Sequence, residues 1–411
     1  MSVYAVPATA GTARSGPALD ALNFFLADVH GGLGPYLAIY LLTVGQWNEA
    51  QIGAVMSVAG IAGVLAQTPA GALVDATHAK RVLVVAAAAI VSLASIALLY
   101  AWGFLAVAAS QAVVGSAGAV FGPAIAAISL GIVGLPKLAH RIGRNEAFNH
   151  AGNAVTASIA GFAGYVWGPV AVFVLLAVMA IASIASTLCI PARAIDHDRA
   201  RGLVDGETHD ADAPSGLLVV LTCRPLLVFA GCAILFHLAN AAMLPLVGQK
   251  LALSNRNEAT ALMSGCIVAA QLVMIPMAVL VGRKADVWGR KGLFLAGFAI
   301  LTLRGLLYPL SNNPFWLLGV QTLDGVGAGL YGALFPLIVA DLTRGTGRFN
   351  VSQGAISSAQ GIGASLSTAI AGVIVVTGGY SAAFLSLAAI AACGFVVFWW
   401  AMPETGEANT A

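Results

Sequence analysis

Stretches of about 20 apolar residues recur along this 411-residue chain, and only short polar segments separate them. An α-helix needs about 20 such residues to cross the hydrocarbon core of a bilayer, which is about 30 Å thick. Only 9% of the residues are charged, whereas an ordinary soluble domain has about 25%. A soluble fold could not cover its surface with so few charges. The pattern therefore excludes a soluble enzyme, a disordered chain and a disulfide scaffold, and it predicts a polytopic membrane protein.

The apolar runs form two groups of six, and a polar, highly charged segment at residues 192–216 separates them. We predict an all-α membrane protein with twelve transmembrane helices in two six-helix bundles, at residues 20–191 and 217–402. Residues 192–216 form a solvated cytoplasmic linker, and residues 1–19 and 403–411 form cytoplasmic tails. The predicted spans are about 20–43, 51–74, 82–102, 104–134, 146–166, 170–191, 225–248, 258–282, 292–310, 315–341, 351–376 and 381–402.

The span at residues 104–134 is too long for one straight crossing, and Gly122-Pro123 predicts a kink inside it. An even number of spans places both termini on the same side of the membrane. If that side is the cytoplasm, only Lys250 and Arg256 lie in the opposite loops. The positive-inside rule therefore predicts cytoplasmic termini, and we expect the inner (plasma) membrane of a bacterium. The basic residues on the cytoplasmic side are then Lys80, Arg81, Lys137, Arg141, Arg144, Arg283, Lys284, Arg290, Lys291, Arg344 and Arg348.

The two groups of spans carry matching motifs at a nearly constant offset. Gly71-Ala-Leu-Val-Asp75 ends the second span, and Gly282-Arg-Lys-Ala-Asp286 ends the eighth, 211 positions later. Gln111-x-x-x-Gly115 recurs as Gln321-x-x-x-Gly325, and Pro35 recurs as Pro245, each 210 positions later. These matches indicate a duplicated six-helix unit. Parallel repeats with a binding site between them near the membrane midplane are typical of transporters.

With these motifs the chain resembles transporters of the major facilitator superfamily over essentially its whole length. That family carries the loop signature G-x-L-A-D-R-x-G-R-K-x-R between its second and third spans, and Ala76 departs from it here. The resemblance implies that the two copies of the loop are conformational latches that stabilise the outward-open state. An aspartate in such a loop can accept hydrogen bonds from a helix N-terminus or pair with arginine. The latch residues are Gly71, Asp75, Lys80 and Arg81 in the first copy, and Gly282, Asp286, Gly289, Arg290 and Lys291 in the second.

A further family motif is absent. Many proton antiporters of the superfamily carry an arginine in the fourth span, within R-x-x-Q-G-x-G. Gln111 stands at the aligned position of this chain. Drug–proton antiport therefore does not follow from the resemblance alone.

Few polar side chains lie deep inside the apolar spans. A charge at the bilayer centre costs about 2.5–3.5 kcal/mol on insertion scales, so such residues mark a cavity or a partner. In the superfamily the first, fourth, seventh and tenth spans line the central cavity, and most of the deep polar residues fall there. We predict a substrate and proton cavity made by Asp28, His30, Tyr36, Gln111, His237, Asn240, Gln321 and Asp324.

Several of these residues have alternative roles. Asp28 and His30 either carry protons, contact the substrate or are satisfied structurally by neighbouring helices. Arg304 is the only basic residue deep in an apolar run. If it forms an ion pair with Asp324, that carboxylate is not free to carry protons. Asn149 and Asn153 share one helix face, and they either line the inner vestibule or pack against the eighth span.

These observations favour a secondary active transporter that works by rocker-switch alternating access. Its expected substrate is a small amphipathic metabolite or drug, its coupling ion the proton, and its direction export. The chain has no phosphate-binding loop and no catalytic constellation, so we expect no enzyme activity, no cofactor, no bound metal and no nucleic-acid partner. We expect a monomer in the lipid bilayer. Two alternatives are an exporter of a metal ion or metal chelate, with Asp28, His30 and His237 as ligands, and a non-transporting membrane sensor.

Overall fold

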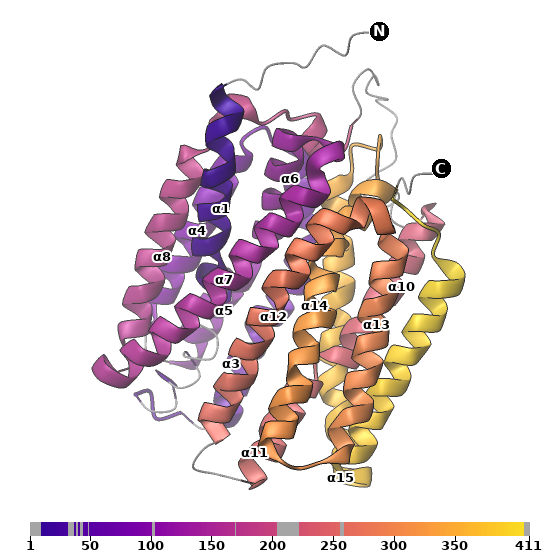
Figure 1. Ribbon diagram of the computed structural model, residues 1–411. Coiled ribbons are helices and arrows are strands. Elements are labelled where there is room, and N and C mark those ends of the chain that lie inside the picture. Colours follow the sequence, from indigo (N-terminus) through magenta and orange to yellow (C-terminus); the bar gives the residue numbers. More distant parts are fainter. Residues whose placement is uncertain are drawn as a thin grey trace.

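The computed structural model describes residues 10–31, 37, 40–41, 44–47, 49–100, 103–168, 170–203, 222–254 and 259–406. These residues are helical or lie in short connections, and they include no strand. Nine of their helical segments are long and apolar enough to cross a membrane. Figure 1 shows the long helices running side by side in one bundle. The all-α membrane fold that the sequence predicts is confirmed.

The described helices are divided between the two halves of the chain. Those of the first half of the chain are α1 (Ala10–Gly31), α3 (Glu49–Ala76), α4 (Lys80–Ala97), α5 (Phe104–Gly118), α6 (Phe121–Val133), α7 (Leu135–Trp167) and α8 (Val170–Cys189). Two short 3₁₀ turns follow, η1 (Ala192–Ala194) and η2 (Arg199–Arg201). The second half contains α10 (Arg224–Asn240), α11 (Met243–Ser254), α12 (Ala259–Trp288), α13 (Arg290–Leu307), η3 (Tyr308–Leu310), α14 (Pro314–Leu342) and α15 (Phe349–Ala401).

Two helix interruptions follow from single residues. The chain breaks between α5 and α6 just before the predicted Gly122-Pro123 kink, because Pro123 has no N–H to donate to the carbonyl of Ala119. α15 contains two helices that meet at Gly379, whose φ of +78° is unfavourable for a residue with a side chain. The predicted spans at 351–376 and 381–402 lie on either side of this glycine. The total of twelve spans stays a prediction.

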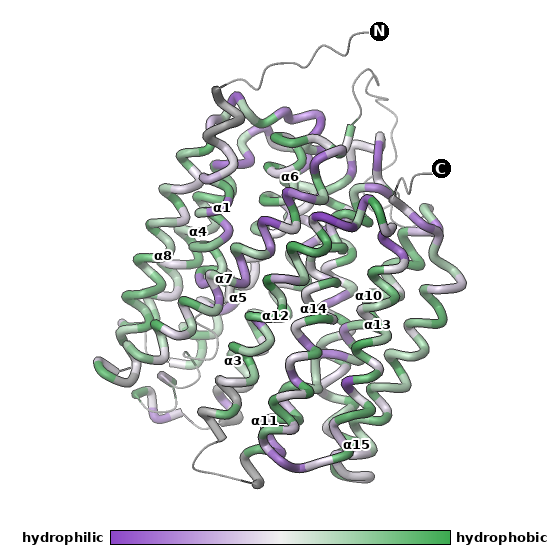
Figure 2. Tube along the Cα trace, viewed as in Figure 1, coloured by the Kyte–Doolittle hydropathy of each residue, from purple (hydrophilic) through white to green (hydrophobic). Residues whose placement is uncertain are grey.

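Two helices begin earlier than the sequence predicts. α1 starts at Ala10 rather than near residue 20, and α7 starts at Leu135 rather than near residue 146. The early part of α7 carries Lys137, Arg141 and Arg144, which do not fit the apolar pattern of a membrane span. Figure 2 shows hydrophilic residues continuing along α7 from one end of the bundle into its interior.

The apolar side chains form two cores. The first core joins α1, α3–α6 and α8 around residues such as Leu22 and Phe173. The second joins α10–α15 around Phe236 and Phe298, and it extends into α6 and α7 of the first half through residues such as Leu130. Contacts between the halves are made mainly by α7 with α12 and by α3 with α15. This arrangement agrees with two bundles, whose boundaries at 20–191 and 217–402 stay predictions.

The halves meet most closely at one end of the bundle. We call it the basic end, because Lys80, Lys137, Arg199, Arg290 and Arg344 lie there. The first turn of α1 and the last turn of α15 lie toward the same end (Figure 1). Glycines make the helix crossings possible. A Cβ atom on Gly143 of α7 would lie 2.6 Å from the Cα of Gly282 of α12, so only small residues fit there.

The described part of the linker, residues 192–203, is docked rather than fully solvated. Ile195 and Ala200 are buried. The N–H of Asp196 donates to the carbonyl of Gly131 in α6 over 3.1 Å, and the N–H of Gly345 donates to the carbonyl of Gly202 over 2.7 Å. The segment therefore contacts both halves at the basic end. The rest of the predicted linker, residues 204–216, lies outside the described residues.

Candidate functional site

The first latch copy joins the two halves directly. Asp75, at the end of α3, accepts hydrogen bonds from the backbone N–H of Val351 at 2.9 Å and from the side chain of Asn350 at 2.8 Å. Both donors belong to the first turn of α15, so the carboxylate caps a helix N-terminus, where negative charge is favoured. The same Asn350 amide donates to the carbonyl of Ala200 in the linker over 2.9 Å. Asp75 thus sits at a junction of α3, α15 and the linker.

The neighbouring latch residues support this junction. Gly71 lets α3 approach α15, because a Cβ atom there would overlap the carbonyl of Asn350 and lie 2.8 Å from the Cα of Val351. Lys80 is buried and donates from Nζ to the carbonyl of Thr77 over 2.8 Å. Arg81 donates to the carbonyl of Leu188 at the end of α8 over 2.8 Å.

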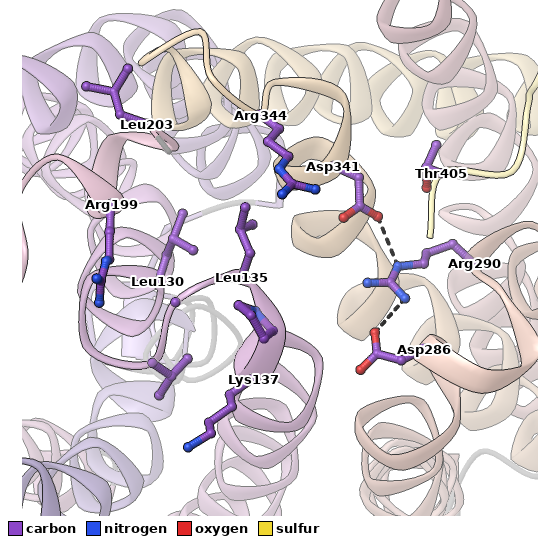
Figure 3. A pocket seen from close by; sticks show the side chains of 13 residues that line it. Leu130, Leu135, Lys137, Arg199, Leu203, Asp286, Arg290, Asp341, Arg344 and Thr405 are labelled. Atoms are coloured by element: carbon purple, nitrogen blue, oxygen red, sulfur yellow. Dashed lines mark hydrogen bonds and ion pairs between the residues drawn. The ribbon is translucent and has the colours of Figure 1, made fainter. Parts of the chain in front are cut away.

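The second latch copy closes within its own half. Arg290 pairs with Asp286 at 2.7 Å and with Asp341 at 3.0 Å. Gly289 has a φ of +81°, and the following N–H groups of Arg290 and Lys291 donate to Glu404 at 2.7 and 3.1 Å. Figure 3 shows Arg290 between the two aspartates on one wall of a cavity of about 690 Å³. Lys137 and Arg199 stand on the opposite wall (Figure 3). Gly282, the remaining predicted latch glycine, lies at the close crossing of α12 with α7.

A second cavity, of about 190 Å³, lies between the halves and is called the central cavity below. Its walls come from α1, α6 and α7 in the first half and from α14 and α15 in the second. The polar lining residues are Asn23, Asn145, Glu146, Asn149 and Gln353, and the apolar ones include Leu26, Phe121, Ile142, Phe335 and Pro336.

Glu146 is the one ionisable residue among the described residues that line the central cavity. Its Oε2 atom accepts a hydrogen bond from Asn149 at 3.3 Å and lies 3.9 Å from Nε2 of His150. Nδ1 of His150 lies 2.8 Å from the side-chain oxygen of Gln271 in α12. About a quarter of the Glu146 side chain is accessible. The carboxylate therefore stands at the interface of the halves, next to an imidazole that also contacts the second half.

A group of ion pairs holds the neighbouring turn of α7 in place. Arg141 and Arg144 both pair with Asp20 of α1. Arg141 also donates to the side-chain oxygen Oδ1 of Asn145 over 2.8 Å, and the side-chain nitrogen of Asn145 donates to the Ser129 hydroxyl over 2.8 Å. Both polar ends of Asn145 are thereby occupied, so this side chain presents a fixed wall to the cavity.

The structure brings three of the predicted cavity residues together, but inside the second half and not in the central cavity. Asn240, Gln321 and Asp324 all lie in the second half, where each belongs to one hydrogen-bond network around Arg304 and Tyr308. Arg304 pairs with Asp324, as one of the two readings of the sequence predicted. None of the three is among the described residues that line the central cavity.

The other predicted cavity residues are dispersed. His237 packs edge-on against Tyr331 at 4.8 Å and its Nδ1 contacts the carbonyl of Ala233. Asp28 and Gln111 are buried in α1 and α5, and neither is among the described lining residues. His30 belongs to α1, but its side chain lies outside the described part, as does all of Tyr36. The described residues contain no group of three or more His, Cys, Asp or Glu that could hold a metal ion.

Sequence reasoning missed Asn23, Asn145, Glu146 and Gln353 as cavity residues, and it left the role of Asn149 open. Glu146 was placed at the start of a span beginning near residue 146. Because α7 starts at Leu135, Glu146 lies about 16 Å along the helix at 1.5 Å per residue. The charged residues before Glu146 do not resemble a membrane span, so the sequence did not indicate how far along the helix Glu146 lies. The polar face formed by Asn145, Glu146, Asn149 and Asn153 was the available signal.

Comparisons with known proteins agree with this architecture. The family model of the Major Facilitator Superfamily matches residues 19–348 and 266–411. An uncharacterized MFS-type transporter of Mycobacterium tuberculosis strain CDC 1551 / Oshkosh is 57% identical to this chain over 410 residues. The match covers 99% of this chain and 96% of the relative. An uncharacterized MFS-type transporter of strain H37Rv matches with the same identity and coverage. The fold also matches FucP, a Major Facilitator Superfamily transporter solved in the outward conformation, with a TM-score of 0.73, 12% identity, and coverage of 96% of this chain and 100% of that one. This chain belongs to the Major Facilitator Superfamily and is a membrane transporter of that family.

Proposed function

We propose that this protein is a secondary active transporter that exports a small amphipathic molecule in exchange for protons by rocker-switch alternating access. The observation that carries the proposal is the central cavity between the two halves, together with the closure of the basic end beside it. A site lined by both halves can be exposed to either side of a membrane when the halves rock. The proposal is supported by the contacts of Asp75 with α15 and of Gly143 with Gly282, which join the halves at the basic end.

In this proposal the basic end faces the cytoplasm, as the positive-inside rule requires. Both termini are then cytoplasmic, the protein resides as a monomer in an inner membrane, and the latch residues govern access from the cytoplasm. Protons are exchanged at a carboxylate inside the bundle. Glu146, whose Oε2 atom lies 3.9 Å from Nε2 of His150 at the interface, and Asp28, buried in α1, are the two candidates.

The test is transport by the purified chain in proteoliposomes. Ligands are first found by a thermal-shift screen of metabolites and drugs. Gradient-driven accumulation and counterflow exchange are then measured for wild type, Glu146→Gln and Asp28→Asn. We expect substitution of the proton-exchanging carboxylate to abolish accumulation but retain counterflow. Flux that is insensitive to a protonophore, or full accumulation in both variants, would refute proton coupling.

A further inference from the structure

Among the described residues that line the central cavity, Glu146 is the one ionisable side chain, and none is lysine or arginine. The nearest guanidinium groups, those of Arg141 and Arg144, are committed to Asp20. His150 lies at 3.9 Å, too far for a hydrogen bond with Glu146. Most of the Glu146 side chain is shielded from water. Ionisation of a shielded carboxyl group is favourable only with a positive partner, so a cationic ligand would complete this site.

The three asparagine side chains that line the cavity have fixed orientations. The amide of Asn23 donates to the carbonyl of Leu19 at 2.7 Å, that of Asn145 to Ser129, and that of Asn149 to Glu146. These partners fix the orientation of all three amides, because a carbonyl or carboxylate oxygen requires a donor, and Asn145 also accepts from Arg141. The side-chain oxygen of Asn23 has no partner among the described residues.

Gln353 adds another acceptor from the opposite half. Its side chain is buried, and its Oε1 atom has no hydrogen-bond partner among the described residues. A buried acceptor without a donor is destabilising by about 1–3 kcal/mol. The residues that line the cavity and keep an acceptor oxygen without a partner group are therefore Asn23 in α1, Glu146 in α7 and Gln353 in α15. An ammonium group supplies three N–H donors and a positive charge.

The remaining walls limit the size and shape of the ligand. A volume of about 190 Å³ is below the roughly 300–1,000 Å³ of pockets for drug-sized molecules. Phe121 and Phe335 contribute aromatic surface, and the ring of Phe335 stacks on Phe229 and Tyr331 behind it. Aromatic faces attract cations as well as apolar groups.

We propose that the central cavity binds a small primary ammonium compound with an apolar body, with Glu146 as its counter-ion and with Asn23 and Gln353 as hydrogen-bond acceptors. This proposal rests on the proposed transporter function and names the substrate class of the same site. Because Glu146 and Gln353 belong to different halves, the ligand links the two halves directly. Its binding free energy can therefore bias the rocking motion.

The test measures binding to the purified full-length protein by isothermal titration calorimetry. The probes are butylammonium, 2-phenylethylammonium and 2-(indol-3-yl)ethylammonium, compared with 2-phenylethanol, phenylacetate and the N,N,N-trimethyl derivative of 2-phenylethylammonium. We expect at least one primary ammonium to bind at least about tenfold more tightly than all three comparison compounds, because a charge-assisted hydrogen bond contributes about 1.5–3 kcal/mol. Equal affinity for the amine and the alcohol, or no binding by any of the three amines, would overturn the proposal.

Three variants separate this site from other carboxylates. Glu146→Gln should weaken amine binding at least about tenfold with little effect on 2-phenylethanol, and Glu146→Asp should recover part of the affinity. Asp198→Asn, in the exposed linker, is the matched control and should bind as wild type does. Loss of binding in Asp28→Asn but not in Glu146→Gln would overturn the assignment to Glu146.

Counterflow of the same amine in proteoliposomes distinguishes the two proposals. Binding that depends on Glu146 without any flux would refute the proposed export function and retain the ammonium site. Transport of a neutral or anionic molecule that is unaffected by Glu146→Gln would retain the transporter function and refute the ammonium site.

Discussion

At the scale of single residues, the strongest electrostatic feature of the second half is the buried pair of Arg304 and Asp324. Arg304 is 1% exposed, and its guanidinium also donates to Asn240 at 2.7 Å and to the Tyr308 hydroxyl at 3.2 Å. All of these partners lie in the second half of the chain, in α10, η3 and α14. The network therefore stabilises the second half and has no described contact with the first.

We expect Arg304→Leu to lower the unfolding free energy by about 3–5 kcal/mol, because it leaves Asp324 buried and uncompensated. The double variant Arg304→Leu/Asp324→Leu should recover much of that loss, since an apolar pair leaves no unpaired charge. Thermal unfolding in detergent and the expression level measure both effects. Arg193→Leu, on the exposed part of the linker, is the control and should stay near wild type. An Arg304→Leu protein as stable as the wild type would contradict this role.

Hydropathy along the sequence identifies Arg304 and Asp324 as deep charged residues but does not identify Glu146 as one. A charge inside a long apolar run is conspicuous, so Arg304 and Asp324 could be recognised and paired by their similar depth. Glu146 follows two arginines, and its depth depends on where α7 begins. The ion pairs of Arg141 and Arg144 with Asp20 are what allow α7 to extend its charged turns beside α1. Hydropathy alone contains no signal for such tertiary partners.

At the scale of helices, the crossing of α3 and α15 depends on a glycine. We expect Gly71→Ala to force the two helices apart at the basic end, since its Cβ atom would lie 2.7 Å from the carbonyl carbon of Asn350. Separation there also breaks the cap that Asp75 forms on α15. Spin labels on His140→Cys and Arg283→Cys, in a background without native cysteines, would report a longer and broader distance distribution.

Gly60→Ala is the matched control for this change. Gly60 lies on the same helix, and a Cβ atom there would meet no atom within 4 Å. It should leave the label distance unchanged. If Gly71→Ala and Gly60→Ala gave the same distribution, the close approach at Gly71 would not be what keeps the basic end closed.

The linker offers a second prediction at this scale. Its composition predicts a solvated connector, but a Cβ atom on Gly131 would lie 2.7 Å from the carbonyl oxygen of Asp196 and 3.0 Å from Ala200. We expect Gly131→Ala to displace residues 195–201 from α6 and to accelerate trypsin cleavage after Arg199 and Arg201. Gly231→Ala, whose added methyl would meet nothing within 4 Å, should be cleaved at the wild-type rate. Unchanged cleavage of Gly131→Ala would show that the docked linker is not held by this contact.

At the scale of the whole molecule, the two copies of the duplicated motif make different contacts. The repeat predicts two equivalent latches, and the two copies begin with the same Gly-x-x-x-Asp pattern. Asp75 reaches across to α15, whereas Asp286 pairs with Arg290 in its own half. The difference arises from Arg290, which lies four residues after Asp286 and binds both it and Asp341. The spacing of the repeated motifs predicts two similar halves. Local ion pairs determine which of the two aspartates contacts the other half.

Alternating access requires α3 and α15 to separate during each transport cycle, and one pair of hydroxyls tests this requirement. Oγ1 of Thr68 lies 3.3 Å from Oγ of Ser358 across the interface, so cysteines at both positions place two sulfur atoms close enough to bond. We expect Thr68→Cys/Ser358→Cys, without the native cysteines, to lose counterflow activity almost completely on oxidation and to regain it with dithiothreitol. Each single cysteine variant should remain active under both conditions. Undiminished counterflow by a fully cross-linked protein would mean that transport proceeds without separation of the halves at this crossing.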